Sequence, residues 1–269
     1  MPNEPVVEAL ATVWESIVEL GADLSEEQWA TPTSLPGWTV KDNVSHMIGT
    51  ERLLAGYPPE ECDATTPDYV KNGIGEINEP SVALRRPLSG AEVLEEFRAI
   101  TAARIEALRS MSDDDMAADS WTPVGPGTYR MFMEVRVFDC WFHEQDIREA
   151  LDLPGHLIGP AAEYAYERTV ASFPYVVGKR AGVPTGSTVT LQLTGDWERT
   201  VHVDVADKAV AVADLDRPAT VTLTCDAFAF GRLTGGRWDK SGEQAVGAVI
   251  IDGDVELGRA IVDALDVVM

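Results

Sequence analysis

The period of the hydrophobic pattern changes once along this chain, and the change limits the folds open to it. In the first half, apolar residues such as Val6, Leu10 and Val13 recur every three or four positions, as on one face of an α-helix. From Val189 onward they alternate with polar residues, with Leu191 next, as in strands that have one buried face. Helices followed by strands predict a protein of the α+β class.

Four amphipathic helices are expected in the first half, at residues 6–20, 39–56, 89–111 and 128–151. Thr39 with Asp42, and Ser89 with Glu92, have the spacing of capping boxes, which mark helix starts. Four helices of this length predict a four-helix bundle. Residues 57–88 show no clear period and contain several prolines. We therefore expect them to form a long, partly ordered connection.

A fifth helical stretch, residues 161–179, leads into the second half. The alternating residues that follow predict half-buried antiparallel strands joined by hairpins, and residues 255–265 predict a closing helix. The change of pattern places a boundary near residues 154–160. We predict two domains: a helical bundle at 1–155 and a smaller α+β domain with an antiparallel sheet at 160–269.

Acidic residues outnumber basic ones by 45 to 21, and the formal net charge is −24. Such a chain lacks the basic face that binds nucleic acid, and an anionic membrane surface repels it. No apolar run approaches the ~20 residues that span a bilayer, and the N-terminus has no signal-peptide pattern. Three distant cysteines, Cys62, Cys140 and Cys225, form no disulfide framework. We expect a cytoplasmic protein without nucleic-acid or membrane partners.

The helix expected at 128–151 carries charged residues on its apolar side. On a helical wheel, Asp139, His143 and Asp146 lie on the same side as Val135. Burying these groups without partners would cost on the order of several kcal/mol. Either a network of ion pairs or a metal ion would compensate. Asp-x-x-x-His presents one oxygen and one nitrogen on one helix face, a spacing that suits a divalent metal.

A third ligand is expected from another helix. His46 lies within the helix expected at 39–56 and is the natural candidate among four histidines. The wheel puts it away from the apolar stripe, so periodicity alone predicts an exposed side chain. As a ligand it would have to line a cleft, and Asp42, one turn earlier, would orient its ring. We expect His156 and His202 at the surface, and Cys140 in the core.

Two segments resemble the signatures of a known family. They are Leu35-Pro36-Gly37-Trp38-Thr39-Val40-Lys41-Asp42-Asn43-Val44-Ser45-His46 and Arg136-Val137-Phe138-Asp139-Cys140-Trp141-Phe142-His143-Glu144-Gln145-Asp146-Ile147-Arg148. The chain resembles the mycothiol-dependent maleylpyruvate isomerase family. The resemblance covers most of the chain and implies a DinB-like metal-binding bundle followed by a sterol-carrier-like domain.

The resemblance also implies the site residues. A histidine of the first motif joins an acidic residue and a histidine of the second around a divalent metal, usually zinc. Carried over, the ligands are His46, Asp139 and His143; the family commonly has glutamate where this chain has Asp139. A C-terminal arginine takes part in catalysis, and Arg237 matches it best, with Arg232 second.

The implied cosubstrate is mycothiol, a low-molecular-weight thiol that the metal activates at the coordination position left open by three protein ligands. The thiolate attacks a small electrophile. It either isomerises a maleylpyruvate-like substrate by adding to a conjugated double bond and leaving again, or stays attached as in an S-transferase. His46 and Arg237 are the expected catalytic residues, with Arg237 binding a substrate carboxylate.

Two other classes of function remain open. The C-terminal domain would carry a lipid or another small molecule in a non-catalytic binding protein, with the bundle as an interaction module. Alternatively, the polar face of the bundle would bind a partner protein. The sequence leaves open the substrate, the identity of the metal, with iron or nickel beside zinc, and the oligomeric state.

Overall fold

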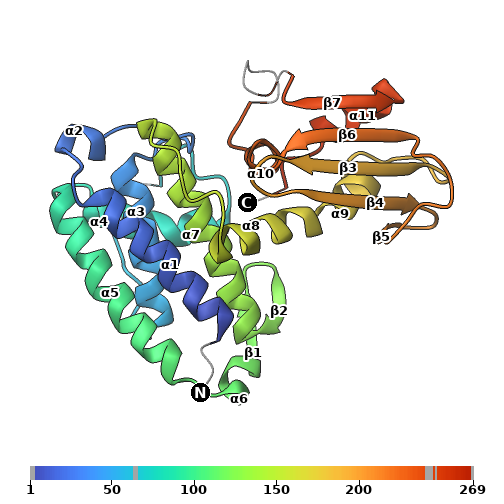
Figure 1. Ribbon diagram of the computed structural model, residues 1–269. Helices are drawn as coiled ribbons and strands as arrows, with labels where there is room; N and C mark the ends of the chain where they lie inside the picture. The colour runs from blue at the N-terminus through green and yellow to red at the C-terminus, as the bar shows by residue number, and fades with distance from the viewer. Residues whose placement is uncertain (1–3, 63–65, 240–244, 246, 268–269) are drawn as a thin grey trace. The chain divides into compact units, whose positions relative to one another are not determined.

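The computed structural model describes residues 4–62, 66–239, 245 and 247–267. It divides into two compact units, Met1–His156 and Leu157–Met269 (Figure 1). The first is helical and the second is built around a sheet, so the predicted α+β class is confirmed. The division falls inside the stretch 154–160 where the sequence pattern changes.

Among the described residues, the first unit is a bundle of four long helices, to which shorter elements are added (Figure 1). Helix α1 packs against α5 and α7, and α3 packs against α4, α5 and α7. A short hairpin, β1–β2, precedes α7. The elements are α1 (Pro5–Gly21), α2 (Glu26–Trp29), α3 (Val40–Leu54), α4 (Gly73–Arg85), α5 (Gly90–Ser110), α6 (Asp113–Ala117), β1 (Asp119–Thr122), β2 (Gly125–Thr128) and α7 (Tyr129–Leu151).

Local side-chain chemistry sets the starts of the long helices. Thr39 and Asp42 form a reciprocal capping box at α3, and Ser89 and Glu92 form another at α5, as predicted. Thr128 caps α7 by accepting a hydrogen bond from the backbone amide of Met131. These contacts satisfy amide groups that have no partner inside the helix.

The predicted connection at residues 57–88 is wrong over its second half, where α4 forms. Ion pairs rather than an apolar stripe hold this segment, so the hydrophobic pattern does not reveal it. Arg85 of α4 binds Glu60 at 2.8 Å and Glu96 of α5 at 2.7 Å. Gly49 lets α4 approach α3 closely, because a Cβ atom there would lie only 1.9 Å from Ser81 Oγ.

The second unit begins with helical segments and continues into a five-stranded sheet of order β5-β4-β3-β6-β7. The stretch expected as one helix at 161–179 is broken into two helices and a π-helical turn, η1. The elements are α8 (Pro160–Ala171), α9 (Phe173–Tyr175), η1 (Val176–Arg180), β3 (Thr188–Thr194), β4 (Arg199–Val205), β5 (Ala209–Val212), β6 (Val221–Asp226), α10 (Ala227–Thr234), β7 (Val249–Gly253) and α11 (Val255–Asp263).

The sheet is mixed, so the prediction of an antiparallel sheet is wrong for one of its four strand pairs. β3 pairs in parallel with β6, whereas the other three pairs are antiparallel. Residues 213–220 connect β5 to β6, and Arg217 in this connection binds Asp204 of β4 at 2.5 Å. Alternation has a period of two in either arrangement, so the sequence pattern does not distinguish them.

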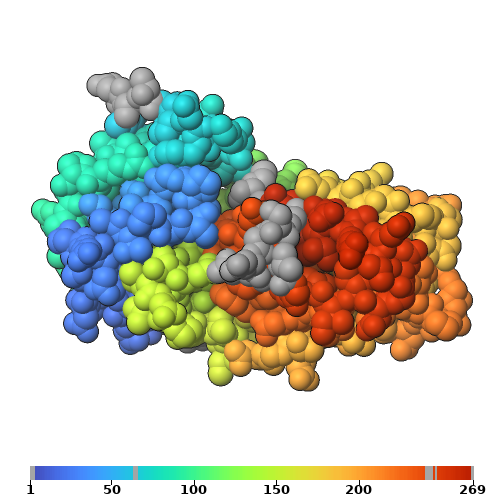
Figure 2. Space-filling view, turned by 90° about the horizontal axis from the view of Figure 1, so that it is seen from above, coloured from blue at the N-terminus to red at the C-terminus, as the bar shows by residue number. Residues whose placement is uncertain are grey.

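The second unit buries one face of its sheet. Val189 pairs with Val221 and Leu191 with Leu223, and all four side chains are buried. β7 and α11 follow at the end of the chain, and this segment reaches the surface, as the red area in Figure 2 shows. Within the described residues, no helix has both the length and the apolar character needed to cross a membrane.

Candidate metal centre

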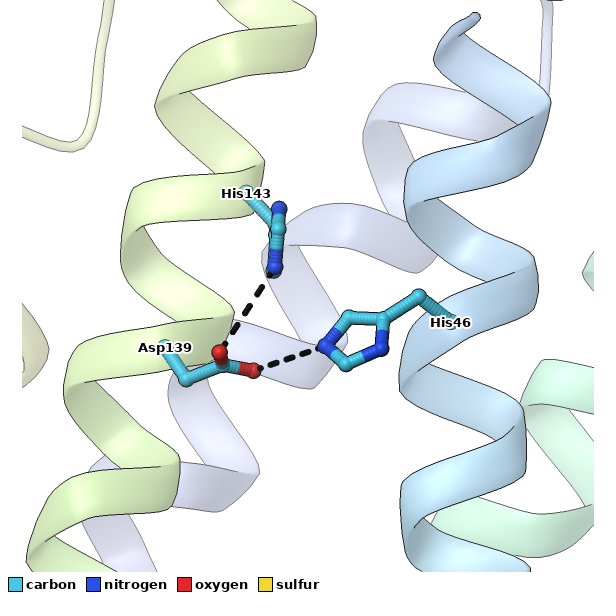
Figure 3. Close-up of side chains that lie close together, drawn as sticks. All are labelled: His46, Asp139 and His143. Atoms are coloured by element: carbon cyan, nitrogen blue, oxygen red, sulfur yellow. Dashed lines mark hydrogen bonds and ion pairs between the residues drawn. The ribbon is translucent and has the colours of Figure 1, made fainter. Parts of the chain in front are cut away.

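Three side chains from two helices of the first unit meet at one point. His46 comes from α3, and Asp139 and His143 lie one turn apart on α7 (Figure 3). His46 Nε2 lies 3.3 Å from Asp139 Oδ2, and His143 Nε2 lies 3.6 Å from Asp139 Oδ1. One donor atom from each residue can be chosen so that all three lie within 4.8 Å of one another. The structure thus brings together the three predicted ligands.

The prediction of an exposed His46 is wrong, because its exposed fraction is only 5 %. The apolar stripe of Val40, Val44 and Met47 is buried on one side of α3. α3 packs against α4, α5 and α7, so a residue away from that stripe is buried as well. A single-helix wheel assumes one buried face and misses a helix with several neighbours. The side chain of Asp139, by contrast, keeps 29 % of its surface exposed.

The ring of His143 is held from the side opposite to Asp139. Its Nδ1 lies 2.8 Å from Asn43 Oδ1 and 3.4 Å from Asp146 Oδ2. Asn43 Nδ2 donates to the carbonyl of Thr39, so its Oδ1 is the acceptor that faces the ring. Nδ1 of His143 therefore carries a proton, and the lone pair of the neutral ring lies on Nε2, toward Asp139. This is the arrangement in which histidine binds metals.

The predicted partner of His46 is wrong. Asp42 accepts hydrogen bonds from Thr39 and pairs with Arg86 at 3.4 Å, so it serves the helix start rather than the ring. Nδ1 of His46 is buried without a hydrogen-bond partner among the described residues. The other nitrogen, Nε2, faces Asp139 (Figure 3).

Trp38 forms a wall beside the two imidazoles. Its ring centroid lies 5.3 Å from that of His46 and 5.9 Å from that of His143. The indole nitrogen donates to Glu79 of α4 at 3.4 Å, and Glu79 in turn accepts from Tyr69 at 2.6 Å. α4, which the sequence did not predict, therefore positions a side chain of the site.

The electrostatics of the cluster keep its carboxylate ionised. Burial opposes ionisation of Asp139, but Arg136, His143 and His46 outweigh it and hold its pKa well below the ordinary value. Burial lowers the pKa of His46, despite the nearby Asp139. Burial acts in the same direction on His143, but Asp139 and Asp146 together raise the pKa of that ring.

The arrangement fits a divalent metal. Bonds of 2.0–2.2 Å around a tetrahedral ion place neighbouring ligand atoms about 3.3–3.6 Å apart. The two distances between imidazole nitrogens and Asp139 oxygens, 3.3 and 3.6 Å, are of this size, but they end on different oxygens. With one donor atom from each residue, the three atoms lie within 4.8 Å of one another, close enough to converge on one ion. Two imidazoles and one carboxylate are a donor set that suits zinc and leaves one position of a tetrahedron open.

Two histidines outside the cluster differ from their predictions, whereas a cysteine beside it agrees. His156 is half-buried rather than at the surface, because its Nδ1 contacts the buried Glu144 at 2.6 Å. His202 is also half-buried, in β4, and contacts Thr190 at 2.9 Å. The predicted core position of Cys140 is confirmed, and burial raises the pKa of its thiol to about 12.

The predicted catalytic arginines belong to the second unit. Arg237 is half-buried after α10 and donates to the carbonyl of Gly235 at 2.8 Å. Arg232 is buried within α10, with its guanidinium 5.8 Å from the ring of Phe228. The catalytic role of either arginine stays a prediction.

The comparisons with known proteins agree with the motifs. The sequence pattern of the "Mycothiol maleylpyruvate isomerase N-terminal domain" matches residues 10–148, just over half of the chain. The chain belongs to the mycothiol maleylpyruvate isomerase family. The match includes His46, Asp139 and His143, so all three candidate ligands lie in the segment that defines the family.

Two further proteins and two crystal structures are similar to this chain. Two uncharacterised proteins of Mycobacterium tuberculosis, from strains H37Rv and CDC 1551 / Oshkosh, are each 25% identical to it over 149 residues. That match spans 55% of this chain and 56% of each relative, only about half of their length. Crystal structures of the mycothiol-dependent maleylpyruvate isomerase share the fold. One is of a mutant with a histidine replaced by alanine (TM-score 0.55) and the other is of the isomerase itself (0.53). Both are 16% identical to this chain, with 95% of both chains covered.

Proposed function

We propose that this chain is a metal-dependent enzyme that uses a low-molecular-weight thiol, mycothiol, to act on a small electrophile. His46, Asp139 and His143 would hold the metal, Zn²⁺ by the chemistry of the donor set. The reaction would be either isomerisation of a maleylpyruvate-like substrate or transfer of the thiol. A reduced thiol cosubstrate agrees with the cytoplasmic location predicted from the cysteines.

One observation carries this proposal. Three side chains of types that can bind a metal, separated by up to 97 positions in the sequence, converge within the segment that matches the family pattern. Ion pairs alone explain the cluster less well, because two imidazole rings share one carboxylate and their centroids lie only 4.8 Å apart. A divalent cation would provide one common partner for the two imidazole nitrogens and the carboxylate.

When bound, zinc would supply a Lewis acid that lowers the pKa of a thiol at the open position. The residues of this chain prepare that position. Asn43 and Asp146 hold the proton of His143 on Nδ1 and keep Nε2 available. Trp38 lies beside the two imidazoles and would shield a bound ion from water on that side. Arg237 stays the predicted anchor for a substrate carboxylate.

The test is metal analysis of the purified full chain together with thiol-dependent turnover. Candidate electrophiles include maleylpyruvate for isomerisation and an alkyl halide for thiol transfer. We expect about one zinc per chain, and loss of both zinc and turnover in His46→Ala and His143→Ala. His202→Ala is the matched control, because His202 lies in β4 of the second unit and should leave both unchanged.

The outcomes separate the classes of function. A chain that contains no metal and binds none when zinc is added would refute the proposal and favour the non-catalytic carrier. A chain that binds zinc but shows no thiol-dependent turnover would retain the metal centre and refute the enzymatic assignment.

A further inference from the structure

Glu51 is a fully buried acidic residue of α3 that lies outside the candidate ligand set. Its exposed fraction is 0%. Oε1 accepts a hydrogen bond from Arg136 Nε at 2.8 Å, and Oε2 accepts one from Arg104 Nε at 3.0 Å. The two arginines come from α7 and α5, so one carboxylate ties three helices of the bundle together.

Arg136 connects this carboxylate to the metal centre. While its Nε donates to Glu51, its Nη1 donates to Asp139 Oδ2 at 2.5 Å, one turn along α7. Its Nη2 donates to Cys140 Sγ at 3.3 Å. All three nitrogens of the planar guanidinium therefore have acceptors, and the plane is held in one orientation.

The orientation of Arg136 matters because the two oxygens of Asp139 contact three side chains. Oδ1 faces His143 and Oδ2 faces both His46 and Arg136. A rotation of this carboxylate about its Cβ–Cγ bond would move both oxygens away from the imidazoles. The side chain is partly exposed, so packing alone does not prevent such a rotation. The hydrogen bond from Arg136 does.

Stability by itself is a weak reason for this arrangement. Ion pairs buried in a protein often contribute no more than apolar residues of similar volume, because desolvation offsets their attraction. Glu51, Arg104 and Arg136 are each less than 5% exposed, so the full cost of desolvation applies. A role at the metal centre explains why a fixed guanidinium stands beside Asp139.

We propose that Glu51 is a positioning residue of the metal centre, which acts through Arg136 to fix the carboxylate of Asp139 for metal binding. This inference rests on the proposed metal site. Side chains that orient a metal ligand without contacting the metal typically contribute a factor of about 10–100 in metal affinity.

The experiment measures zinc affinity of the full chain by competition with a chelator. We expect Glu51→Gln, which keeps the shape and removes the charge, to bind zinc about tenfold more weakly than wild type. Glu60→Gln is the matched control, because Glu60 is also paired with arginine but contacts Arg52, Ser81 and Arg85 instead. It should lose stability and keep its zinc affinity.

A double-mutant cycle with Arg136→Met separates positioning from a general structural effect. If Glu51 acts through Arg136, the double variant binds zinc no more weakly than Arg136→Met alone. Full additivity of the two losses would overturn the inference. The visible spectrum of the Co²⁺-substituted protein is a second readout, because it reports ligand geometry and should change in Glu51→Gln but not in Glu60→Gln.

The remaining outcomes are also decisive. If Glu51→Gln does not fold, Arg136→Lys replaces it, because lysine keeps the charge but cannot hold Glu51 and Asp139 in one plane. Unchanged zinc affinity in the folded variant, with zinc bound by wild type, overturns this inference alone. A wild-type chain that binds no zinc refutes the proposed metal site and this inference with it. Zinc binding without thiol-dependent turnover leaves the inference standing while the enzymatic proposal fails.

Discussion

Asn43 Oδ1 lies 2.8 Å from Nδ1 of His143, and this contact sets which nitrogen of the ring faces the other candidate ligands. Asn43 is fully buried, and its amide nitrogen is engaged by the carbonyl of Thr39. The start of α3 is thereby linked to the orientation of a side chain on α7. The same few residues cap a helix and orient a candidate metal ligand.

The first prediction follows from this contact. Asn43→Ala removes the acceptor for Nδ1 and should weaken zinc binding about tenfold, measured by competition with a chelator. It should also cost about 1–2 kcal/mol of unfolding free energy, because a buried hydrogen-bonding group is lost. Asn72→Ala is the control, since Asn72 caps α4 and its loss affects stability without touching His143. Equal zinc affinity in Asn43→Ala and wild type would contradict the role of Asn43.

The second prediction concerns removal of the metal. A ligand that binds only the folded state at 100 times its Kd adds about 2.7 kcal/mol of stability. For a unit of this size, a chelator should therefore lower the melting temperature by about 5–10 °C. His46→Ala should melt at one temperature with or without zinc, whereas His202→Ala should keep the wild-type difference. Calorimetric scans on zinc-loaded and stripped protein provide the measurement, and identical scans for wild type would count against the metal site.

The third prediction is a loss of stability in acid at the contact between Glu60 and Arg85. The hydrogen bond from Arg85 lowers the pKa of Glu60 from 4.5 to about 2 in the folded chain. Because the folded pKa is depressed, the stabilisation is complete above pH 4.5 and disappears as the pH falls toward 2. It amounts to about 3 kcal/mol at most.

Denaturant unfolding between pH 5 and 2 measures this effect. Glu60→Gln should flatten the fall in unfolding free energy over that range, because no proton is taken up at this position. Glu61→Gln, at the exposed neighbouring residue, controls for the loss of one carboxylate. A fall of the same size in Glu60→Gln and wild type would show that the ion pair does not contribute.

The fourth prediction tests the expected role of Arg237. Loss of a charge-assisted hydrogen bond to a substrate carboxylate costs about 1.5–3 kcal/mol. Arg237→Ala should therefore raise KM for an anionic electrophile by about tenfold or more and leave KM for an uncharged one unchanged. Arg259→Ala, at an exposed position of α11, is the control. Equal effects on both electrophiles would rule out recognition of a carboxylate by Arg237.

Much of the architecture could be read from local patterns. The capping boxes at Thr39 and Ser89 act over three residues, so the sequence reports them directly. The spacing of Asp139 and His143 is also local, because residues four apart share a helix face. The ion pairs between Arg85 and its two glutamates join residues 11 and 25 positions away, and the sequence therefore did not reveal α4.

The sequence by itself determined the helical and strand periods, the helix starts and the shared helix face of Asp139 and His143, because each depends on neighbours a few positions apart. Only the tertiary structure decided that β3 and β6 run in parallel, that His46 is buried against α7, and that Glu51 reaches Asp139 through Arg136. These relations depend on which elements pack together. Packing is a property of the whole folded unit, and no single segment carries it.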